Sequence, residues 1–520
     1  MNTRRTALSR RTLAGLAIAA AGAVALAGCS GSSQSGATAT PAKLTSLSIM
    51  APFLSTNAPA AGNQIGTAID KALGVDLKIN WVPNASYEDK TNITLAGSDI
   101  PQVMVIQGKS PGFVKNAQAG AFWDLTNYLK DYPNLKTKTP AVQAASSVNG
   151  KVYGIYRARD AMREGVIIRK DWLAKLGLSV PKTVDDLYKV AKAFTDGDPD
   201  GNGVKDTYGI IIPKWPGGLG TNSPYDAIET WFGAGNTWKK TSKGSLEPSF
   251  MQPEWLKAVD FEKKLVTEGL VNPDYATMDS AKWNEPFLNG KGGIILDVQS
   301  RGAQLMGLLK QKDPAHFQDY IDIGGNLESP SGSLYALPTT GYSGFLAIPK
   351  AQVKTEAQLR SVLAVLDKMN TPALGKLLNN GIEGVTYTES GGLAAAVPNV
   401  PKDLTDAVGS YAQLGTAVSG YYGLPPKQAS DYEQKMYDKR IKIQDSDLKS
   451  AVFNPAAPYV SATYTAQGAQ LDTIMADARI QYLAGQIDAK GLKDAIARWR
   501  SSGGDAVISE INKLYKANNK

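Results

Sequence analysis

From residue 44 onward, short apolar strands alternate with amphipathic helices, and this order limits the chain to a small set of folds. Residues 44–52 and 75–81 have the composition and alternation of strands, and 65–73 carries apolar residues at helical spacing. A helix over 87–96 and an apolar strand over 103–106 follow. Strand, helix, strand, helix, strand is the order of a parallel sheet covered by helices. The sequence therefore predicts an α/β fold.

The same alternation recurs in two later blocks of the chain. The first has strand patterns at 152–155 and 166–168 and a helix that begins after Thr183. The second has a strand at 345–348 and a helix that begins after Thr355. Because 520 residues exceed what one hydrophobic core usually holds, we expect two lobes.

The composition disfavours several kinds of chemistry. Cys29 is the only cysteine and His316 the only histidine. An internal disulfide framework is therefore impossible, and zinc hydrolases, Ser-His-Asp triads and Cys-His nucleophiles, which need imidazole, are disfavoured. Four arginines within residues 1–28 contribute to the formal charge of +8, so +4 remains on the rest of the chain. A charge of that size does not indicate a nucleic-acid partner.

The N-terminal residues have the pattern of an export signal. Basic residues precede a small-residue apolar run over 13–26, which is too short to span a bilayer comfortably. We therefore predict a signal peptide over 1–28. Residues 9–13 also resemble a twin-arginine export motif, but paired arginines are common in ordinary signals, so both export routes stay open.

The end of this segment, Leu26-Ala27-Gly28-Cys29, resembles the lipobox of bacterial lipoproteins. The resemblance implies that the Cys29 thiol receives a diacylglycerol and becomes the mature N-terminus. Residues 30–43 are rich in serine, glycine, alanine and threonine, as in a flexible tether. We thus expect 29–43 to be a lipidated linker that holds the protein on the extracytoplasmic face of the cell membrane.

Six short segments follow the order of motifs in a known family. They lie at 90–103, 150–155, 169–183, 287–293, 346–350 and 381–387. The first five resemble motifs of the extracytoplasmic sugar-binding proteins of ABC importers, the family 1 solute-binding proteins. The sixth is similar to a motif of their larger lipoprotein branch, which includes oligosaccharide and alginate binders.

This resemblance implies a two-lobe, periplasmic-binding-protein-like fold of type II, with ligand held in a cleft between the lobes. The chain would cross between the lobes near 148–156, 336–343 and 386–395. The first lobe would comprise 44–150 and 340–388, and the second 155–336 and 392–520. The implied function is that of a monomer that captures a saccharide, without catalysis, and delivers it to the permease of an ABC importer.

One loop has most of a calcium-binding pattern. Oxygen-bearing groups stand at the first, third, fifth, seventh and ninth positions of an EF-hand-like loop, with Gly203 at the sixth. Gly209 replaces the usual glutamate at the twelfth position, so a further ligand would be water or another residue. A metal-free polar turn is the alternative. The predicted structural Ca²⁺ ligands are Asp198, Asp200, Asn202, Val204 and Asp206.

Ligand contacts are predicted from the chemistry of sugars. Aromatic rings pack on the C–H patches of a sugar, and planar polar side chains pair with its hydroxyls. For each candidate, core packing or plain surface is an equal alternative, and Trp231 is the preferred ring at the cleft wall by resemblance to the family. The candidates at strand ends and crossings are Gln107, Tyr156, Arg157, Arg159, Trp215, Trp231, Asp297, Tyr342, Glu383 and Tyr387.

Two other functions remain open from the sequence. A secreted carbohydrate-active enzyme could use paired carboxylates, which the sequence does not exclude. A peptide-binding importer component would also fit the length of the chain. The calcium-like loop and the segment at 381–387 favour a saccharide over a peptide.

Replacing Cys29 by alanine should release the protein from the membrane, because this thiol is the only predicted site of lipid attachment. Fractionation into membrane and soluble extracytoplasmic pools would measure the release, with Ser30→Ala as a matched control. An unchanged share of Cys29→Ala protein in the membrane fraction would contradict the anchor.

Overall fold

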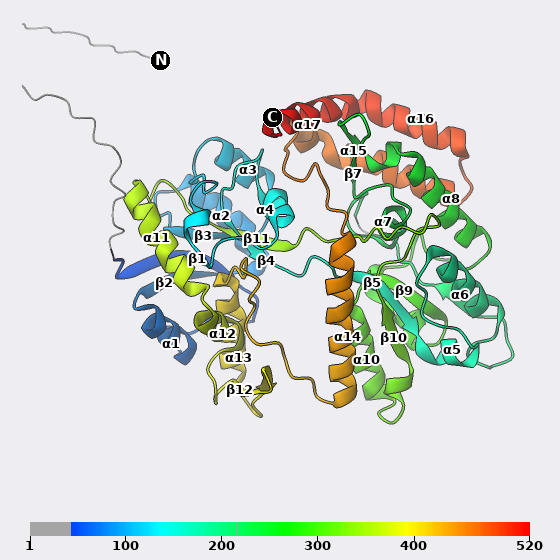
Figure 1. Ribbon diagram of the computed structural model, residues 1–520, viewed down its shortest axis with the longest axis horizontal. Coiled ribbons are helices and arrows are strands. Elements are labelled where there is room, and N and C mark those ends of the chain that lie inside the picture. Colours follow the sequence, from blue (N-terminus) through cyan, green and yellow to red (C-terminus); the bar gives the residue numbers. More distant parts are fainter. Residues whose placement is uncertain (1–42, 216, 520) are drawn as a thin grey trace, which may run out of the picture. The chain divides into compact units, whose positions relative to one another are not determined.

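The computed structural model describes residues 43–215 and 217–519 (Figure 1). Its first sheet has five strands in the order β2-β1-β3-β11-β4. β1 pairs in parallel with β2 and β3, whereas β11 runs antiparallel to both β3 and β4. The bounds are β1 (Ser46–Phe53), β2 (Asp76–Pro83), β3 (Val103–Ile106), β4 (Ile155–Ala158) and β11 (Tyr342–Ala347).

Helices that pack against this sheet begin where the sequence supplies capping residues. Thr355 and Gln358 form a reciprocal capping box at the start of α11, and the Asn63 side chain caps α1. The helices are α1 (Gln64–Leu73), α2 (Tyr87–Ala96), α3 (Pro111–Gln118), α4 (Pro140–Ser146), α11 (Glu356–Met369), α12 (Pro372–Asn380) and α13 (Lys402–Tyr411). A small antiparallel hairpin follows α12, formed by β12 (Tyr387–Ser390) and β13 (Leu393–Ala396).

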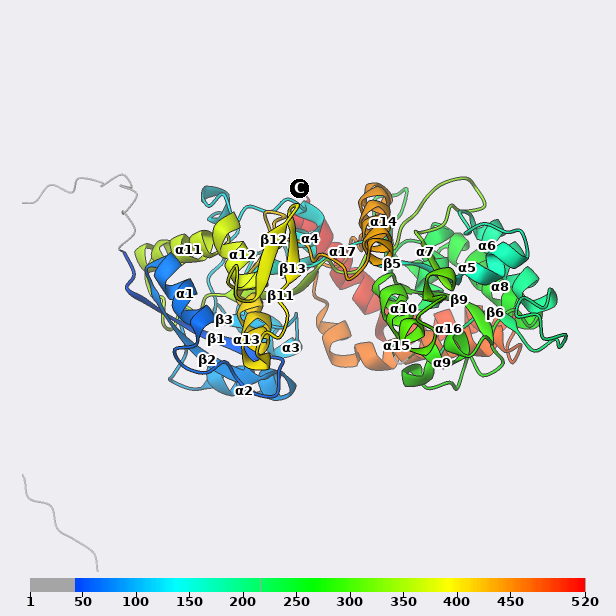
Figure 2. The same cartoon turned by 90° about the horizontal axis from the view of Figure 1, so that it is seen from below.

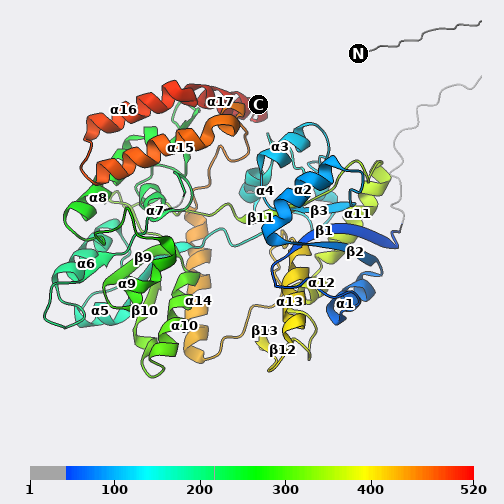
Figure 3. The same cartoon turned by 180° about the vertical axis from the view of Figure 1, so that it is seen from behind.

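The second sheet has four strands in the order β10-β5-β9-β6. They are β5 (Glu164–Arg169), β6 (Tyr208–Ile210), β9 (Gly292–Val298) and β10 (Ile321–Gly324), and a ribbon of β7 (Trp238–Lys240) and β8 (Leu246–Pro248) lies apart from them. The accompanying helices are α5 (Lys170–Lys175), α6 (Val184–Asp196), α7 (Pro224–Trp231), α8 (Pro253–Thr267), α9 (Asn284–Leu288), α10 (Ser300–Lys312), α14 (Asp431–Asp447), α15 (Ala462–Leu483), α16 (Ala489–Trp499) and α17 (Asp505–Asn518). The last three helices pack on one another (Figure 3).

Each sheet has its own hydrophobic core, so the predicted two-lobe α/β fold is confirmed. We call the elements around the first sheet the first lobe and those around the second sheet the second lobe. The chain passes from the first lobe to the second between β4 and β5 and returns between β10 and β11. It passes to the second lobe again between Val418, which is buried in the first core, and α14.

Two predicted lobe boundaries need correction. Residues 155–158 were assigned to the second lobe, but they form β4, whose antiparallel pairing with β11 makes it an edge of the first sheet. The segment from 392 to 418 was also assigned to the second lobe. It packs in the first lobe instead, because α13 buries Ala407 and Tyr411 in the first core, and the Tyr411 ring meets the Trp81 ring edge to face at 5.3 Å. The predicted signal peptide and lipidated linker lie outside the described residues, apart from Lys43.

α14 contacts the second lobe through both charged and apolar side chains. It lies beside α10 (Figures 1 and 2), and among its residues only Asp447 is buried. The Lys310 ammonium is 3.0 Å from a carboxylate oxygen of Glu433, and Lys439 forms an ion pair with Asp322. Tyr432, Met436 and Ile443 of α14 are partly buried against apolar residues of the second lobe, so ion pairs and apolar contacts together hold this helix.

Within the described residues, no helix combines the length and hydrophobicity that a transmembrane segment needs.

A buried charged cluster joins α7, α8 and α15. Arg479 is 2% exposed and lies 2.9 Å from Glu229 and 3.4 Å from Asp226, while both carboxyl oxygens of Glu262 have no hydrogen-bond partner among the described residues. Burial raises the pKa of Glu229 to about 7, although Arg479 opposes the rise, and burial raises the pKa of Glu262 well above its usual range. The guanidinium of Arg479 cannot neutralise all three carboxylates of this cluster, so the folded state favours protonation of the cluster.

The free energy of unfolding should fall as pH rises from 5 to 8, by roughly 1–3 kcal/mol from this cluster. The folded pKa values of Glu229 and Glu262 lie above the ordinary value of 4.5, so the folded state binds more protons than the unfolded state within this range. Their stabilisation is complete below about pH 4.5 and is lost as pH passes the folded pKa values. Chemical denaturation at each pH would measure the effect.

The variant Glu262→Gln should flatten this pH profile and equal or exceed the wild type in stability at pH 8. Glu88→Gln, an exposed position on α2, is the control and should leave the profile unchanged. A Glu262→Gln profile parallel to that of the wild type would show that the cluster does not set the pH dependence.

Candidate functional site

Three predicted ligand residues lie together at one edge of the first sheet. Gln107 follows the last residue of β3, Arg157 lies near the end of β4, and Tyr342 begins β11. Because β11 runs antiparallel to both neighbours, its first residues lie opposite their last ones. Gly344, at φ +81°, allows this approach, since a Cβ there would lie 2.1 Å from the carbonyl oxygen of Ile106. The sheet topology thus brings together residues that are far apart in the sequence.

Arg157 is a half-buried cation held by neutral groups. Its Nη1 donates to the carbonyl oxygen of Ser343 at 2.8 Å, and its Nη2 donates to Oε1 of Gln413 at 2.5 Å. Among the described residues its Nε has no partner and no carboxylate forms an ion pair with it. Burial lowers the pKa of Arg157 to about 10, so the group remains charged at neutral pH. The edge of the first sheet therefore carries a fixed positive charge.

A second group of residues lies in the second lobe. The Arg301 side chain forms an ion pair with Asp297 and stacks over the Trp283 ring, 4.2 Å from its centroid. The Trp215 ring meets Trp283 edge to face, with centroids 5.8 Å apart. Trp283 is buried, whereas Trp215 is only half-buried. Trp215 is thus a partly exposed ring that packs against a buried one. The face of a sugar can stack on such an exposed ring.

The segment between β4 and β5 carries charged residues next to both groups. Arg159 is exposed, and its backbone N–H donates to the carbonyl oxygen of Gly341 at 2.9 Å. Glu164, which the sequence analysis missed, is 4% exposed at the start of β5. Burial, with a further contribution from Asp297, raises the pKa of Glu164 to about 8. At neutral pH this carboxyl is mainly protonated, which leaves the charge of the neighbouring arginines uncompensated by it.

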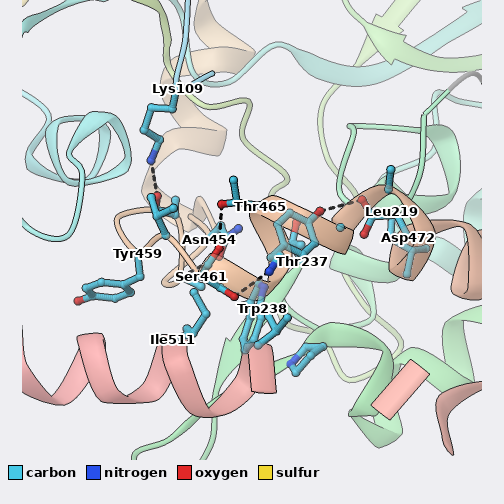
Figure 4. A pocket seen from close by; sticks show the side chains of 18 of the residues that line it. Lys109, Leu219, Thr237, Trp238, Asn454, Tyr459, Ser461, Thr465, Asp472 and Ile511 are labelled. Carbon is cyan, nitrogen blue, oxygen red and sulfur yellow. Dashed lines mark hydrogen bonds between the residues drawn. The ribbon is translucent and has the colours of Figure 1, made fainter. Parts of the chain in front are cut away.

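A cavity of about 540 Å³ is lined by residues of both lobes (Figure 4). The first lobe contributes Lys109, Pro111 and Val114, and the second contributes most of the remaining wall. Its rings are Trp238, Phe250, Tyr459, Tyr464 and Trp499, and its polar side chains include Lys109, Thr237, Asn454, Ser461, Thr465 and Asp472. The volume is within the range of small-ligand pockets.

One face of α15 supplies a polar pair to this cavity. Tyr464 and Asp472 are eight residues apart, so they lie two turns apart on one side of the helix. The Tyr464 hydroxyl donates to a carboxylate oxygen of Asp472 at 2.7 Å, and the ring covers Gly468 between them. Burial raises the pKa of Asp472. Tyr464 is nevertheless 44% exposed, so it presents a fixed ring to a ligand.

None of the ten predicted ligand residues lines this cavity. Gln107 precedes Lys109 by two residues and Trp215 precedes Leu219, another lining residue, by four. Gln107 and Trp215 therefore lie close in sequence to residues that line the cavity, although they do not line it themselves. The spacing of Tyr464, Gly468 and Asp472 on a helix was the available signal for α15, but it resembles that of any helix face.

Of four other predicted residues, three are buried and one is exposed. Trp231 is fully buried in the second core, where its Nε1 donates to Oδ1 of Asn326 at 2.8 Å, and this burial contradicts its predicted place at the cleft wall. Tyr156 is buried in the first core. Tyr387 is buried in the small hairpin region, and Glu383 is exposed nearby without a side-chain hydrogen bond to any described residue. Residue type alone could not separate these buried rings from exposed ones.

The predicted calcium loop follows α6 and is folded around Asn202. The Asp198 carboxylate accepts from the backbone N–H groups of Gly201, Asn202 and Gly203 at 3.0–3.1 Å. The Asn202 amide nitrogen donates to Asp200 at 2.7 Å and to Asp206 at 3.3 Å. The loop oxygens therefore accept from N–H groups of the loop itself, including the Asn202 Oδ1, which accepts from the N–H of Val204 at 2.7 Å.

The fit to a cation is incomplete in this arrangement. Asp206 forms an ion pair with Lys291, which lowers the pKa of Asp206. Over the described part of the chain, no three acidic, histidine or cysteine side chains are gathered as a metal-binding group. A cation would have to displace Lys291 from Asp206 and draw the carboxylates closer together.

Comparison with known proteins identifies relatives over nearly the whole chain. A family model described as bacterial extracellular solute-binding protein matches residues 55–374. Lipoprotein LipO of Bacillus subtilis (strain 168) is 45% identical over 497 residues, covering 95% of this chain and 97% of that protein. The polygalacturonan/rhamnogalacturonan-binding protein YtcQ of the same strain is 32% identical over 497 residues, covering 94% of this chain and 96% of that protein.

Solved structures share the fold at low sequence identity. A solute-binding protein from Bifidobacterium longum infantis, associated with an ABC transporter that binds HMO, aligns with a TM-score of 0.67 and 20% identity over 92% of this chain and 99% of its own. An EF-hand mutant of the ABC-transporter substrate-binding protein FusA from Streptococcus pneumoniae, in complex with fructo-nystose, aligns with a TM-score of 0.56 and 19% identity over 91% of this chain and 99% of its own.

Proposed function

This chain belongs to the bacterial extracellular solute-binding proteins, and from that premise we propose that it captures a saccharide outside the cytoplasm and delivers it to the permease of an ABC transporter. The ligand is an oligosaccharide in this proposal. Two relatives with saccharide names support it: YtcQ, which is named for binding polygalacturonan and rhamnogalacturonan, and FusA, which is named as a fructooligosaccharide-binding component.

The observation that carries the proposal is the cavity lined by both lobes. Lys109 and Pro111 approach it from the first lobe, and Trp238, Tyr459 and Tyr464 approach it from the second. Rings that alternate with hydroxyl, amide and charged groups match the apolar faces and polar rims of sugars. A ligand that contacts both walls favours the arrangement in which the lobes are close, and it shifts the population only by that preference.

Binding and release require no bond to be made or broken, so the proposal assigns no catalytic residue. In this proposal the protein binds its ligand as a monomer, because one chain supplies both walls of the cavity. The closed arrangement would present surfaces of both lobes to the permease. The name of the relative LipO and the Cys29 segment support a lipid anchor on the extracytoplasmic face of the membrane.

The proposal includes structural calcium at the loop of Asp198, Asp200, Asn202, Val204 and Asp206. The carboxylates of Asp200 and Asp206 both accept from the Asn202 amide nitrogen, which brings them close together and supports the proposed site, as does the EF-hand named for FusA, a protein of the same fold. The cation would tie the end of α6 to the loop that precedes β6, and it takes no part in ligand contact.

Wild-type protein should bind oligosaccharides and not peptides, and Trp215→Ala should weaken that binding, because in this proposal the oligosaccharide extends from the cavity past Leu219 to the Trp215 ring. Losing the half-buried ring should cost about 1–3 kcal/mol of binding free energy, or about 5- to 150-fold in Kd. A thermal-shift screen of oligogalacturonides, kestose and peptides, followed by calorimetry on the best ligand, would measure it.

Trp231→Ala is the matched control for this experiment. Because Trp231 is fully buried, its loss should lower the free energy of unfolding by about 3–5 kcal/mol, whereas Trp215→Ala should unfold at nearly wild-type denaturant concentration. Stabilisation by peptides alone, or hydrolysis of the oligosaccharides on incubation, would overturn the proposed function. Normal affinity in Trp215→Ala would remove that ring from the ligand site.

Calcium should raise the melting temperature of the wild type, and the double variant Asp198→Ala with Asp200→Ala should lose this response. The variant removes two of the loop carboxylates but leaves both cores intact. Melting in calcium and in excess chelator would be compared for both proteins, together with elemental analysis. Identical melting of the wild type in both conditions and no bound metal would rule out the calcium site.

A further inference from the structure

Lys109 lies in the short loop between β3 and α3 and extends toward the segment that carries Asn454 and Tyr459 (Figure 4). Its ammonium donates to three carbonyl oxygens: Ala145 at 2.6 Å, Ser147 at 3.1 Å, and Ala457. An ammonium has three N–H groups, so these carbonyls use all of them. No carboxylate within the described residues forms an ion pair with Lys109.

The three carbonyls come from two different parts of the fold. Ala145 and Ser147 lie at the carboxyl end of α4 in the first lobe, where the helix dipole favours a cation. Ala457 belongs to residues 451–461, which join α14 to α15 and which we call the joint segment. Lys109 therefore connects a helix end of the first lobe to a segment that continues into the second lobe.

The joint segment contacts both hydrophobic cores. Phe453 and Val460 pack against the first core, whereas Ala456 belongs to the second. Next to Lys109, the backbone N–H of Asn149 donates to the carbonyl oxygen of Pro458 at 2.7 Å, and its side-chain oxygen accepts from the N–H of Val460 at 2.9 Å. Lys109 and Asn149 thus hold the same segment from the first-lobe side.

We propose that Lys109 is a positioning residue for ligand binding, whose ammonium fastens the joint segment to the first lobe and so holds the part of the cavity wall that the joint segment forms. The inference rests on the proposed function, since the joint segment and α15 line the cavity together with Lys109. If Lys109 is lost, the carbonyls of Ala145, Ser147 and Ala457 have no donor, and the two walls of the cavity are no longer held at a fixed separation.

The first test uses ligand-free protein and does not depend on the identity of the ligand. Hydrogen exchange of the Asn149 and Val460 amides should be several-fold faster in Lys109→Met than in wild type, because the joint segment is freed from the first lobe. Lys115→Met, an exposed lysine on α3, is the matched control and should exchange as the wild type does. Equal exchange in Lys109→Met and wild type would overturn the proposal.

The second test uses the best oligosaccharide from the thermal-shift screen. Kd should rise roughly 10-fold in Lys109→Met, on the scale of losing charge-assisted hydrogen bonds, while the free energy of unfolding of the second lobe is retained.

The two proposals fail in different ways. A wild type that binds no saccharide overturns the proposed function, while the exchange experiment still decides whether Lys109 holds the joint segment. Saccharide binding with equal Kd in Lys109→Met and wild type overturns the role of Lys109 and leaves the proposed function standing.

Discussion

The hydrogen bonds of β11 are the constraint on which the rest of the fold depends. β11 lies between β3 and β4 in the first sheet, although about 180 residues of chain separate it from β4. The chain must therefore leave the first lobe after β4, build most of the second lobe, and return before that sheet is complete. The return brings Tyr342 beside the ends of β3 and β4, where Gln107 and Arg157 lie. Polar groups at this edge are a consequence of strand order, and only Gly344 makes the required close approach possible.

Much of the fold could be predicted from the sequence, because its signals are local. The 75–81 alternation, the cap at Thr355 and the turn residues each act within a few positions, and they correctly indicated α/β elements and two lobes. The boundary after residue 390 was harder to predict. α13 has an ordinary amphipathic pattern, which shows that one face is buried but does not show in which core.

The candidate site was less predictable for a related reason. Trp215 and Trp231 are both tryptophans on or near α7, yet one is half-buried beside Trp283 and the other is fully buried against Asn326. Composition cannot distinguish them, because the difference arises from elements that are distant in sequence. Lys109 was missed because a lysine in a loop normally extends into water, whereas three carbonyls from two other segments hold this one.

The ion pairs that attach α14 to the second lobe should weaken as the salt concentration of the solution rises. Its ion pairs, Lys310 with Glu433 and Lys439 with Asp322, are partly exposed to solvent. Screening shortens the reach of such pairs from about 8 Å at physiological ionic strength to about 3 Å at 1 M. Apolar cores respond in the opposite way, because many salts strengthen apolar burial. Rising salt should therefore shift the attachment of α14 from its two ion pairs toward the apolar contacts of Tyr432, Met436 and Ile443.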